Sequence, residues 1–206
     1  MLLYLLRHGQ TAENAQRIVQ GKGVDASLNE LGRSQAEAFF QYYKHIPFEL
    51  VVTSSLRRTH ETILPFKQAR PELPHSVHSH IDEISWGKFE GKPSTPALHA
   101  EYAGLIQAWG RGELHKSIEN GETAEQIAAR LQVFVAWLKT RPEKHLLVCT
   151  HGGILSFLMA ILQNKPASEM HQYKHRNTGV CKFEYHRATD HFELLAHDNL
   201  DHFSEQ

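Results

Sequence analysis

Short apolar runs alternate along the chain with longer stretches in which apolar residues recur every three or four positions. The runs at 1–6, 50–52 and 145–150 are dominated by apolar residues, as expected of strands buried on both faces of a sheet. Helical spacing of apolar residues is found over 30–43 and 123–138, which gives each predicted helix one apolar side. This alternation predicts an α/β fold with a mainly parallel sheet.

Three further segments fit the same pattern. A helix is expected after the second strand, with Ser54 or Ser55 capping its N-terminus. Weak alternation over 75–81 indicates a third strand, and 153–162 is predicted to be an apolar helix. These segments add to both the sheet and the helical layers that cover it.

The expected architecture is a three-layer α/β/α fold, with a mainly parallel sheet and one antiparallel strand. The antiparallel strand belongs to a closing pair over 180–186 and 192–197. Residues 85–120 interrupt the pattern with glycines and prolines, and one short helix is expected near 97–109. We interpret 1–206 as a single domain in which 85–120 form a small, loop-rich cap insertion.

Composition and charge narrow the classes of partner. The formal net charge is −1, so no electrostatic feature indicates a nucleic-acid or membrane-surface partner. The apolar N-terminus is too short for a membrane span and lacks the features of a signal peptide. Cys149 and Cys181 lie in predicted buried strands, so a disulfide framework is not expected. We expect the protein to be in the reducing cytoplasm.

Two of the predicted strands end in the same dipeptide, His8-Gly9 and His151-Gly152. Because ligands bind beyond the carboxyl ends of parallel strands, the two imidazoles can share one crevice. A glycine at each strand end permits a sharp turn and lets backbone N–H groups approach an anion. Arg7 precedes the first of these histidines, so the pattern indicates an anion site.

A third strand end adds further cationic groups. Arg57 and Arg58 follow the second strand, and a guanidinium can bind two phosphate oxygens at once. Together with the two His-Gly strand ends, these arginines strengthen the indication of an anion site that could bind phosphate. Neither arginine is preferred by this pattern alone.

These motifs, in this order, resemble those of the histidine phosphatase (phosphoglycerate mutase-like) superfamily, and they cover nearly the whole chain. The matching blocks are Arg7-His8-Gly9-Gln10-Thr11 with Asn14, Gln20-Gly21, Leu28-Asn29-Glu30-Leu31-Gly32, Thr53-Ser54-Ser55-Leu56-Arg57-Arg58-Thr59, Asp82-Glu83 through Glu90-Gly91, Gly121-Glu122-Thr123 and Thr150-His151-Gly152-Gly153.

The resemblance implies a phosphatase that needs neither a metal nor another cofactor. His8 would attack phosphorus and become a phosphohistidine, and Glu83 would be the proton donor. Asp82 and Glu90 are the nearest alternatives to Glu83. The phosphate-binding residues implied by the family motifs are Arg7, Arg58, His151, Asn14, Gln20, Gly21 and Gly152.

The substrate implied is a small phosphorylated metabolite, and a homodimer is left open. Within the family, the motif form resembles the phosphatase branch, which includes broad-specificity, α-ribazole and fructose-2,6-bisphosphate phosphatases. The first alternative is a cofactor-dependent phosphoglycerate mutase, but 85–120 is shorter than expected of one and lacks an Arg-Arg pair. The second alternative is a non-catalytic relative that binds a phosphorylated ligand.

Other candidates for chemistry are weaker. Asn14 could simply cap a turn. His75, His78 and His80 invite a metal interpretation, but no cysteine or acidic residue has structural-zinc spacing near them. Four basic residues in the insertion could contact a second anionic group of a substrate: Lys88, Lys92, Arg111 and Lys116.

Overall fold

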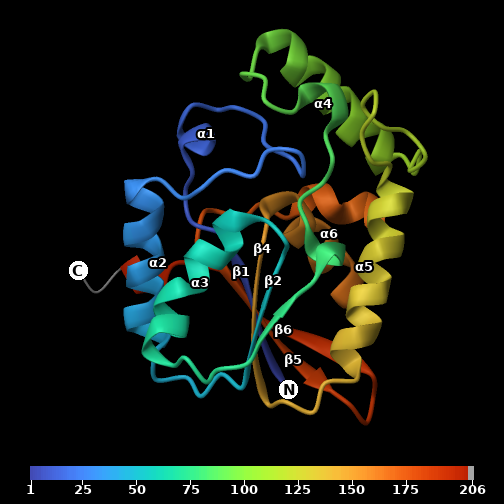
Figure 1. Ribbon diagram of the computed structural model, residues 1–206. Coiled ribbons are helices and arrows are strands. Elements are labelled where there is room, and N and C mark those ends of the chain that lie inside the picture. The colour runs from blue at the N-terminus through green and yellow to red at the C-terminus, as the bar shows by residue number, and fades with distance from the viewer. Residues whose placement is uncertain (204–206) are drawn as a thin grey trace.

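The computed structural model describes residues 1–203 and has one six-stranded sheet at its centre (Figure 1). The strands are β1 (Leu2–Arg7), β2 (Leu50–Thr53), β3 (His75–Val77), β4 (His145–Thr150), β5 (Val180–His186) and β6 (His191–Asn199). Their order is β3-β2-β4-β1-β5-β6, and β5 alone runs in the direction opposite to the other five strands. The predicted fold class, with one antiparallel strand, is therefore confirmed.

Helices cover both faces of the sheet. In Figure 1, α2 (Glu30–Tyr43) and α3 (Arg57–Ala69) lie on one side, while α5 (Ala124–Lys139) and α6 (Gly152–Leu162) lie on the other. Alternate side chains of β1 enter the two cores, because successive residues of a strand point to opposite faces. Leu3 and Leu5 pack in the core beneath α5 and α6, whereas Tyr4 and Leu6 pack in the core beneath α2 and α3.

Residues 85–120 lie beyond the carboxyl ends of the parallel strands, at the top of Figure 1. They contain the short 3₁₀ helix η2 (Gly87–Phe89) and the helix α4 (Pro96–Gly110), which matches the helix expected there. Thr95 caps α4 by accepting a hydrogen bond from the Leu98 N–H at 3.2 Å, and Pro96 occupies the first turn, where proline is tolerated. The short helix α1 (Ala12–Ala15) lies at the same end of the molecule.

Two local predictions were wrong. Helix α3 is not capped by Ser54 or Ser55, because it begins later, after Leu56. The exposed N–H of Arg57 is satisfied instead by Asp25, whose Oδ1 lies 2.7 Å away on a distant loop. The third strand ends at Val77 rather than Ile81, because the chain turns into the 3₁₀ helix η1 (Ser79–Ile81).

Three further 3₁₀ helices connect or follow the main elements. They are η1 (Ser79–Ile81), η3 (Ala167–Gln172) and η4 (Asp201–Phe203). Among residues 1–203, no helix has the length and apolar character needed to cross a bilayer.

Candidate active site

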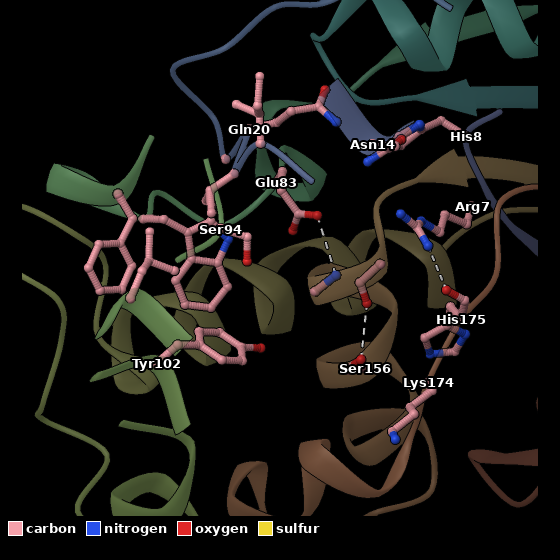
Figure 2. Close-up of a pocket in the computed structure, with 18 of the residues that line it drawn as sticks. Arg7, His8, Asn14, Gln20, Glu83, Ser94, Tyr102, Ser156, Lys174 and His175 are labelled. Atoms are coloured by element: carbon pink, nitrogen blue, oxygen red, sulfur yellow. Dashed lines mark hydrogen bonds between the residues drawn. The ribbon is translucent and has the colours of Figure 1, made fainter. Parts of the chain in front are cut away.

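A cavity of about 480 Å³ opens at the carboxyl ends of β1 and β4 (Figure 2). It lies where the loops after the parallel strands meet the 85–120 segment. Eight of the nine residues that the sequence nominated line it: Arg7, His8, Asn14, Gln20, Gly21, Arg58, Glu83 and Gly152. The ninth, His151, is fully buried and is hydrogen-bonded to the lining residue Arg58.

His8 follows β1 and is only 3% exposed. Its Nδ1 lies 2.7 Å from the carbonyl oxygen of Gly9, which can only accept, so Nδ1 carries the proton. The pKa of His8 lies well below its usual value, first because of burial and then because of the positive charges of Arg58 and Arg7. The ring is therefore neutral, with the lone pair on Nε2 available as a nucleophile.

Arg7 and Arg58 place two guanidinium groups beside this ring. Arg7 donates from Nη1 to the carbonyl of His175 at 2.7 Å, and its buried Nε has no hydrogen-bond partner within residues 1–203. A Cβ at Gly152 would lie 3.3 Å from this Nε, so the glycine keeps the approach to the guanidinium open. A buried donor without a partner is costly, and an anion in the cavity would satisfy it.

Arg58 is held by three acceptors and is only 1% exposed. Nη1 donates to the Val24 carbonyl at 2.7 Å, Nη2 to the Gly21 carbonyl at 3.0 Å, and Nε to Nδ1 of His151 at 3.1 Å. Each terminal nitrogen retains a second hydrogen for an anion. Arg57, one residue earlier, is exposed and does not line the cavity.

Both ring nitrogens of His151 are engaged in this structure. Nδ1 accepts from Arg58, so the proton resides on Nε2, which donates to Oγ of Ser54 at 2.8 Å. The pKa of His151 is well below its usual value, because of burial first and then Arg58. The second histidine is thus a neutral support for Arg58, and its direct contact with phosphate stays a prediction.

Glu83 projects its carboxylate into the middle of the cavity (Figure 2). Oε1 accepts from the Ile84 N–H at 2.9 Å, and Oε2 from the Gly153 N–H at 3.3 Å. A Cβ at Gly153 would lie 2.7 Å from Oε1, so a larger residue there would displace the carboxylate from this position.

The two alternative acids have other partners. Asp82 is 3% exposed and accepts from the Ser55 N–H at 2.7 Å. Glu90 accepts from the N–H groups of Lys22, Gly23 and Trp86 at 3.2, 3.0 and 2.9 Å, which ties two loops together. Neither lines the cavity, so of the three acids Glu83 alone has the position a proton donor needs.

Asn14, Gln20 and Gly21 come from the segment between β1 and α2, which includes the short helix α1. Asn14 completes a capping box with Thr11 at the start of α1, so it caps a turn and also lines the cavity. Gly21 has a positive φ of 62°, and its carbonyl holds Arg58. The side-chain oxygen of Gln20 is buried without a partner in the described part of the chain.

Some of the weaker candidates have structural partners. His75 is hydrogen-bonded to Thr53 and His78 to Ser76, at 2.9 and 3.1 Å. Cys149 is completely buried in β4.

The basic residues of the insertion do not reach the cavity. Lys88 pairs with Glu101 at 2.8 Å, while Arg111 and Lys116 both pair with Glu113. None of the three, nor Lys92, is among the lining residues in the described range.

Sequence reasoning missed three residues that shape the site. Ser54 accepts from His151, and Asn177 donates from Nδ2 to the backbone carbonyl of His8 at 2.9 Å. The carbonyl of His175 holds Arg7. Burial and then the neighbouring His197 lower the pKa of His175 to about 4, so its ring adds no charge beside that guanidinium. No local pattern marks Asn177 or His175, because their partners lie about 170 positions away.

The cavity at this edge of the sheet is surrounded by a neutral imidazole, two guanidinium groups and a carboxylate. This set of groups is typical of an enzyme that acts on phosphate esters. The chain belongs to the histidine phosphatase superfamily (branch 1), whose sequence model matches residues 3–198. It is a phosphoric monoester hydrolase.

Relatives and solved structures agree with this assignment. A probable phosphatase of Schizosaccharomyces pombe is 31% identical over 158 residues, covering 77% of this chain and 71% of the relative. The adenosylcobalamin/alpha-ribazole phosphatase of Salmonella typhimurium is 28% identical over 175 residues, covering 84% of this chain and 85% of the relative. The mycobacterial glucosyl-3-phosphoglycerate phosphatase, solved with VO3, has a TM-score of 0.83 at 27% identity, covering 97% of this chain and 99% of that one.

Proposed function

We propose that this phosphatase hydrolyses a small-molecule phosphomonoester through a phosphohistidine on His8, without a metal or other cofactor. The observation that carries the proposal is the 2.7 Å contact from Nδ1 of His8 to the Gly9 carbonyl. It fixes the tautomer and leaves Nε2 as the attacking atom. The single domain and the role of 85–120 as a cap over this cavity are part of the same proposal.

In the first step, Nε2 of His8 attacks phosphorus as the bond to the ester oxygen breaks. Arg7 and Arg58 hold the equatorial oxygens, where negative charge is carried through the transition state. Glu83 gives its proton to the departing oxygen, so the alcohol leaves neutral. The phosphorylated ring keeps its Nδ1 proton on the Gly9 carbonyl.

In the second step, water attacks the phosphohistidine. The Glu83 carboxylate takes one proton from this water as the new P–O bond forms, and the P–N bond breaks to return neutral His8. Inorganic phosphate leaves, and Glu83 is again protonated. Asn14, Gln20, Gly21 and Gly152 would complete the phosphate pocket, while His151 supports Arg58 and would have to turn from Ser54 to contact phosphate itself.

Two of the relatives carry the name of a compound, adenosylcobalamin/alpha-ribazole in one and glucosyl-3-phosphoglycerate in the other, which supports a small metabolite as substrate. The mutase alternative would need a cavity that keeps water from the phosphohistidine and binds a diacid. The non-catalytic alternative would leave the neutral ring of His8 and the placement of Glu83 without a purpose.

The test measures hydrolysis of p-nitrophenyl phosphate in excess EDTA by the parent, by His8→Ala and by the control variant His186→Ala. In the parent, His186 on β5 forms an exposed hydrogen bond with Glu193. We expect parental turnover in the control and at least a 10³-fold loss in His8→Ala. Rapid quench of the parent should trap protein-bound phosphate that is stable in base and lost in acid. Parental activity in His8→Ala would overturn the proposal.

An inactive parent would favour one of the alternatives. Turnover of 3-phosphoglycerate that depends on a bisphosphoglycerate primer would then support the mutase. Phosphate binding without turnover of either substrate would support the non-catalytic relative.

A further inference from the structure

The wall of the cavity opposite the phosphate-binding groups is apolar and aromatic. It is formed by Trp86, Phe89, Leu98 and Tyr102, which we call the aromatic wall. We propose that it binds an aromatic ring in the alcohol portion of the substrate. The proposal rests on the proposed phosphatase function and names the class of ester that the same site prefers.

Helix α4 supplies the wall with an apolar stripe that continues beyond the protein core. Leu98, Tyr102, Leu105 and Trp109 recur at spacings of three and four and therefore share one side of the helix. Leu105 and Trp109 are buried in the core, whereas Tyr102 is 39% exposed. The open part of the stripe faces the cavity, so a ligand there can cover the apolar surface that the protein leaves uncovered.

The aromatic wall is held in place before any ligand binds. Trp86 lies edge-to-face with Tyr102, with ring centroids 5.3 Å apart, and stacks on Trp109 at 6.2 Å. The indole N–H of Trp109 donates to the Lys116 carbonyl at 2.8 Å, and the backbone N–H of Trp86 donates to Glu90 at 2.9 Å. A fixed aromatic surface binds a ring at little entropic cost.

The proton donor lies between the two ends of the cavity. In Figure 2, Glu83 stands between Tyr102 on one side and Arg7 and His8 on the other. The pKa of Tyr102 is raised, by burial first and then by the negative charge of Glu83, so the phenol is neutral and near that carboxylate. With phosphorus at His8 and the ester oxygen at Glu83, the group on that oxygen extends toward the aromatic wall.

The charges around the cavity disfavour a second phosphate at this wall. Beyond Arg7 and Arg58, Lys174 is the one lysine or arginine among the lining residues within 1–203, and Figure 2 places it on the His175 side. His99 and Ser94 also line the cavity, and they are hydrogen-bonded to each other. Lys88, which is close in sequence to the wall, is paired with Glu101 and Glu119 at 2.8 and 3.9 Å. A compact sugar bisphosphate would therefore leave the apolar surface of the wall uncovered, and its second phosphate would meet no lysine or arginine there.

The experiment compares kcat/KM for 2-phenylethyl phosphate and propyl phosphate, whose alcohols have similar acidity, so that chemistry contributes little to the ratio. The variants are Tyr102→Ala and Leu98→Ala, with Tyr42→Ala on the remote helix α2 as a matched control. We expect the parent and the control to prefer the phenyl ester about tenfold or more, as burial of one ring against aromatic side chains allows. Both wall variants should reduce that preference to about threefold or less.

Equal kcat/KM for the two esters in the parent would overturn the aromatic subsite and leave the phosphatase function intact. Full retention of the preference in both wall variants would overturn it as well. If neither ester is hydrolysed, the phosphatase function fails separately. The subsite is then tested by calorimetry, which compares the affinities for benzylphosphonate and methylphosphonate. Tighter binding of benzylphosphonate by the parent, lost in Tyr102→Ala, would support the aromatic subsite. Equal affinities for the two phosphonates would overturn it.

Discussion

Arg58 and His151 are joined directly, with Nε of the guanidinium donating to Nδ1 of the imidazole at 3.1 Å. A permanently charged donor on Nδ1 prevents that nitrogen from being protonated, which fixes the tautomer of His151. The same contact holds the guanidinium beside His8. One residue from β4's end and one from α3 thus position each other, although 93 positions separate them in the chain.

Arg58→Lys should lose most activity even though the charge is kept. An ammonium on a flexible chain cannot reach the carbonyls of Gly21 and Val24 and Nδ1 of His151 while also holding phosphate. We expect kcat/KM for p-nitrophenyl phosphate to fall about 10²-fold or more. Arg57→Lys is the control, and circular dichroism checks the fold. A loss below about threefold in Arg58→Lys would contradict the role of the guanidinium.

Gly9→Ala should destabilise the protein, because its Cβ would lie 2.6 Å from the backbone oxygen of Gly32. Backbone cannot yield as a flexible side chain can, so we expect a loss of about 1–3 kcal/mol in the free energy of unfolding. Gly104→Ala in α4 meets nothing within 4 Å and should stabilise by up to about 1 kcal/mol. Urea denaturation of both variants measures the difference, and equal stabilities would refute the clash.

Neither cysteine should react in the folded protein. Cys149 and Cys181 are 0% exposed. Burial raises the pKa of both thiols, that of Cys181 to about 12, so the reactive thiolate is rare at neutral pH. A thiol reagent such as DTNB at pH 8 should label neither residue in the native state and both in urea. Rapid labelling of the native protein would show that one of the strands opens.

Stability should fall on the acid side partly because of His202, which is 3% exposed. Burial lowers its pKa to about 4, against 6.5 for an exposed histidine. Below pH 6.5 His202 of the unfolded chain binds a proton, whereas His202 of the folded protein stays neutral down to about pH 4. The free energy of unfolding therefore decreases as the pH falls from 6.5 to 4. Above pH 6.5 His202 is neutral in both states, so its stabilising contribution is present in full.

The matched variant is His202→Gln, compared with the parent by urea denaturation at pH 7 and pH 5. The parent should lose up to about 2 kcal/mol more than the variant between these two values, since each unit of pKa difference corresponds to about 1.4 kcal/mol. The other buried histidines remain in both proteins and cancel in the comparison. Equal losses of stability in the parent and the variant would mean that folding does not lower the pKa of His202.

The chain's own order of residues determined the framework of the site. An apolar run that ends in Arg7-His8-Gly9 forms a strand buried on both faces, and its polar residues must then lie at the strand's carboxyl end. The same reasoning placed His151. Local pattern sufficed there because strand formation depends on neighbouring residues and parallel strands share one edge.

The tertiary structure shows why adjacent candidates differ. Asp82 and Glu83 are neighbours, yet the first turns toward the Ser55 backbone and the second into the cavity. Family spacing favoured Arg58 over Arg57, and packing of α3 against the sheet buries the one and exposes the other. Asn177 and Asp25 meet their partners across the fold. Such choices depend on the direction of each side chain after packing, which no local sequence pattern contains.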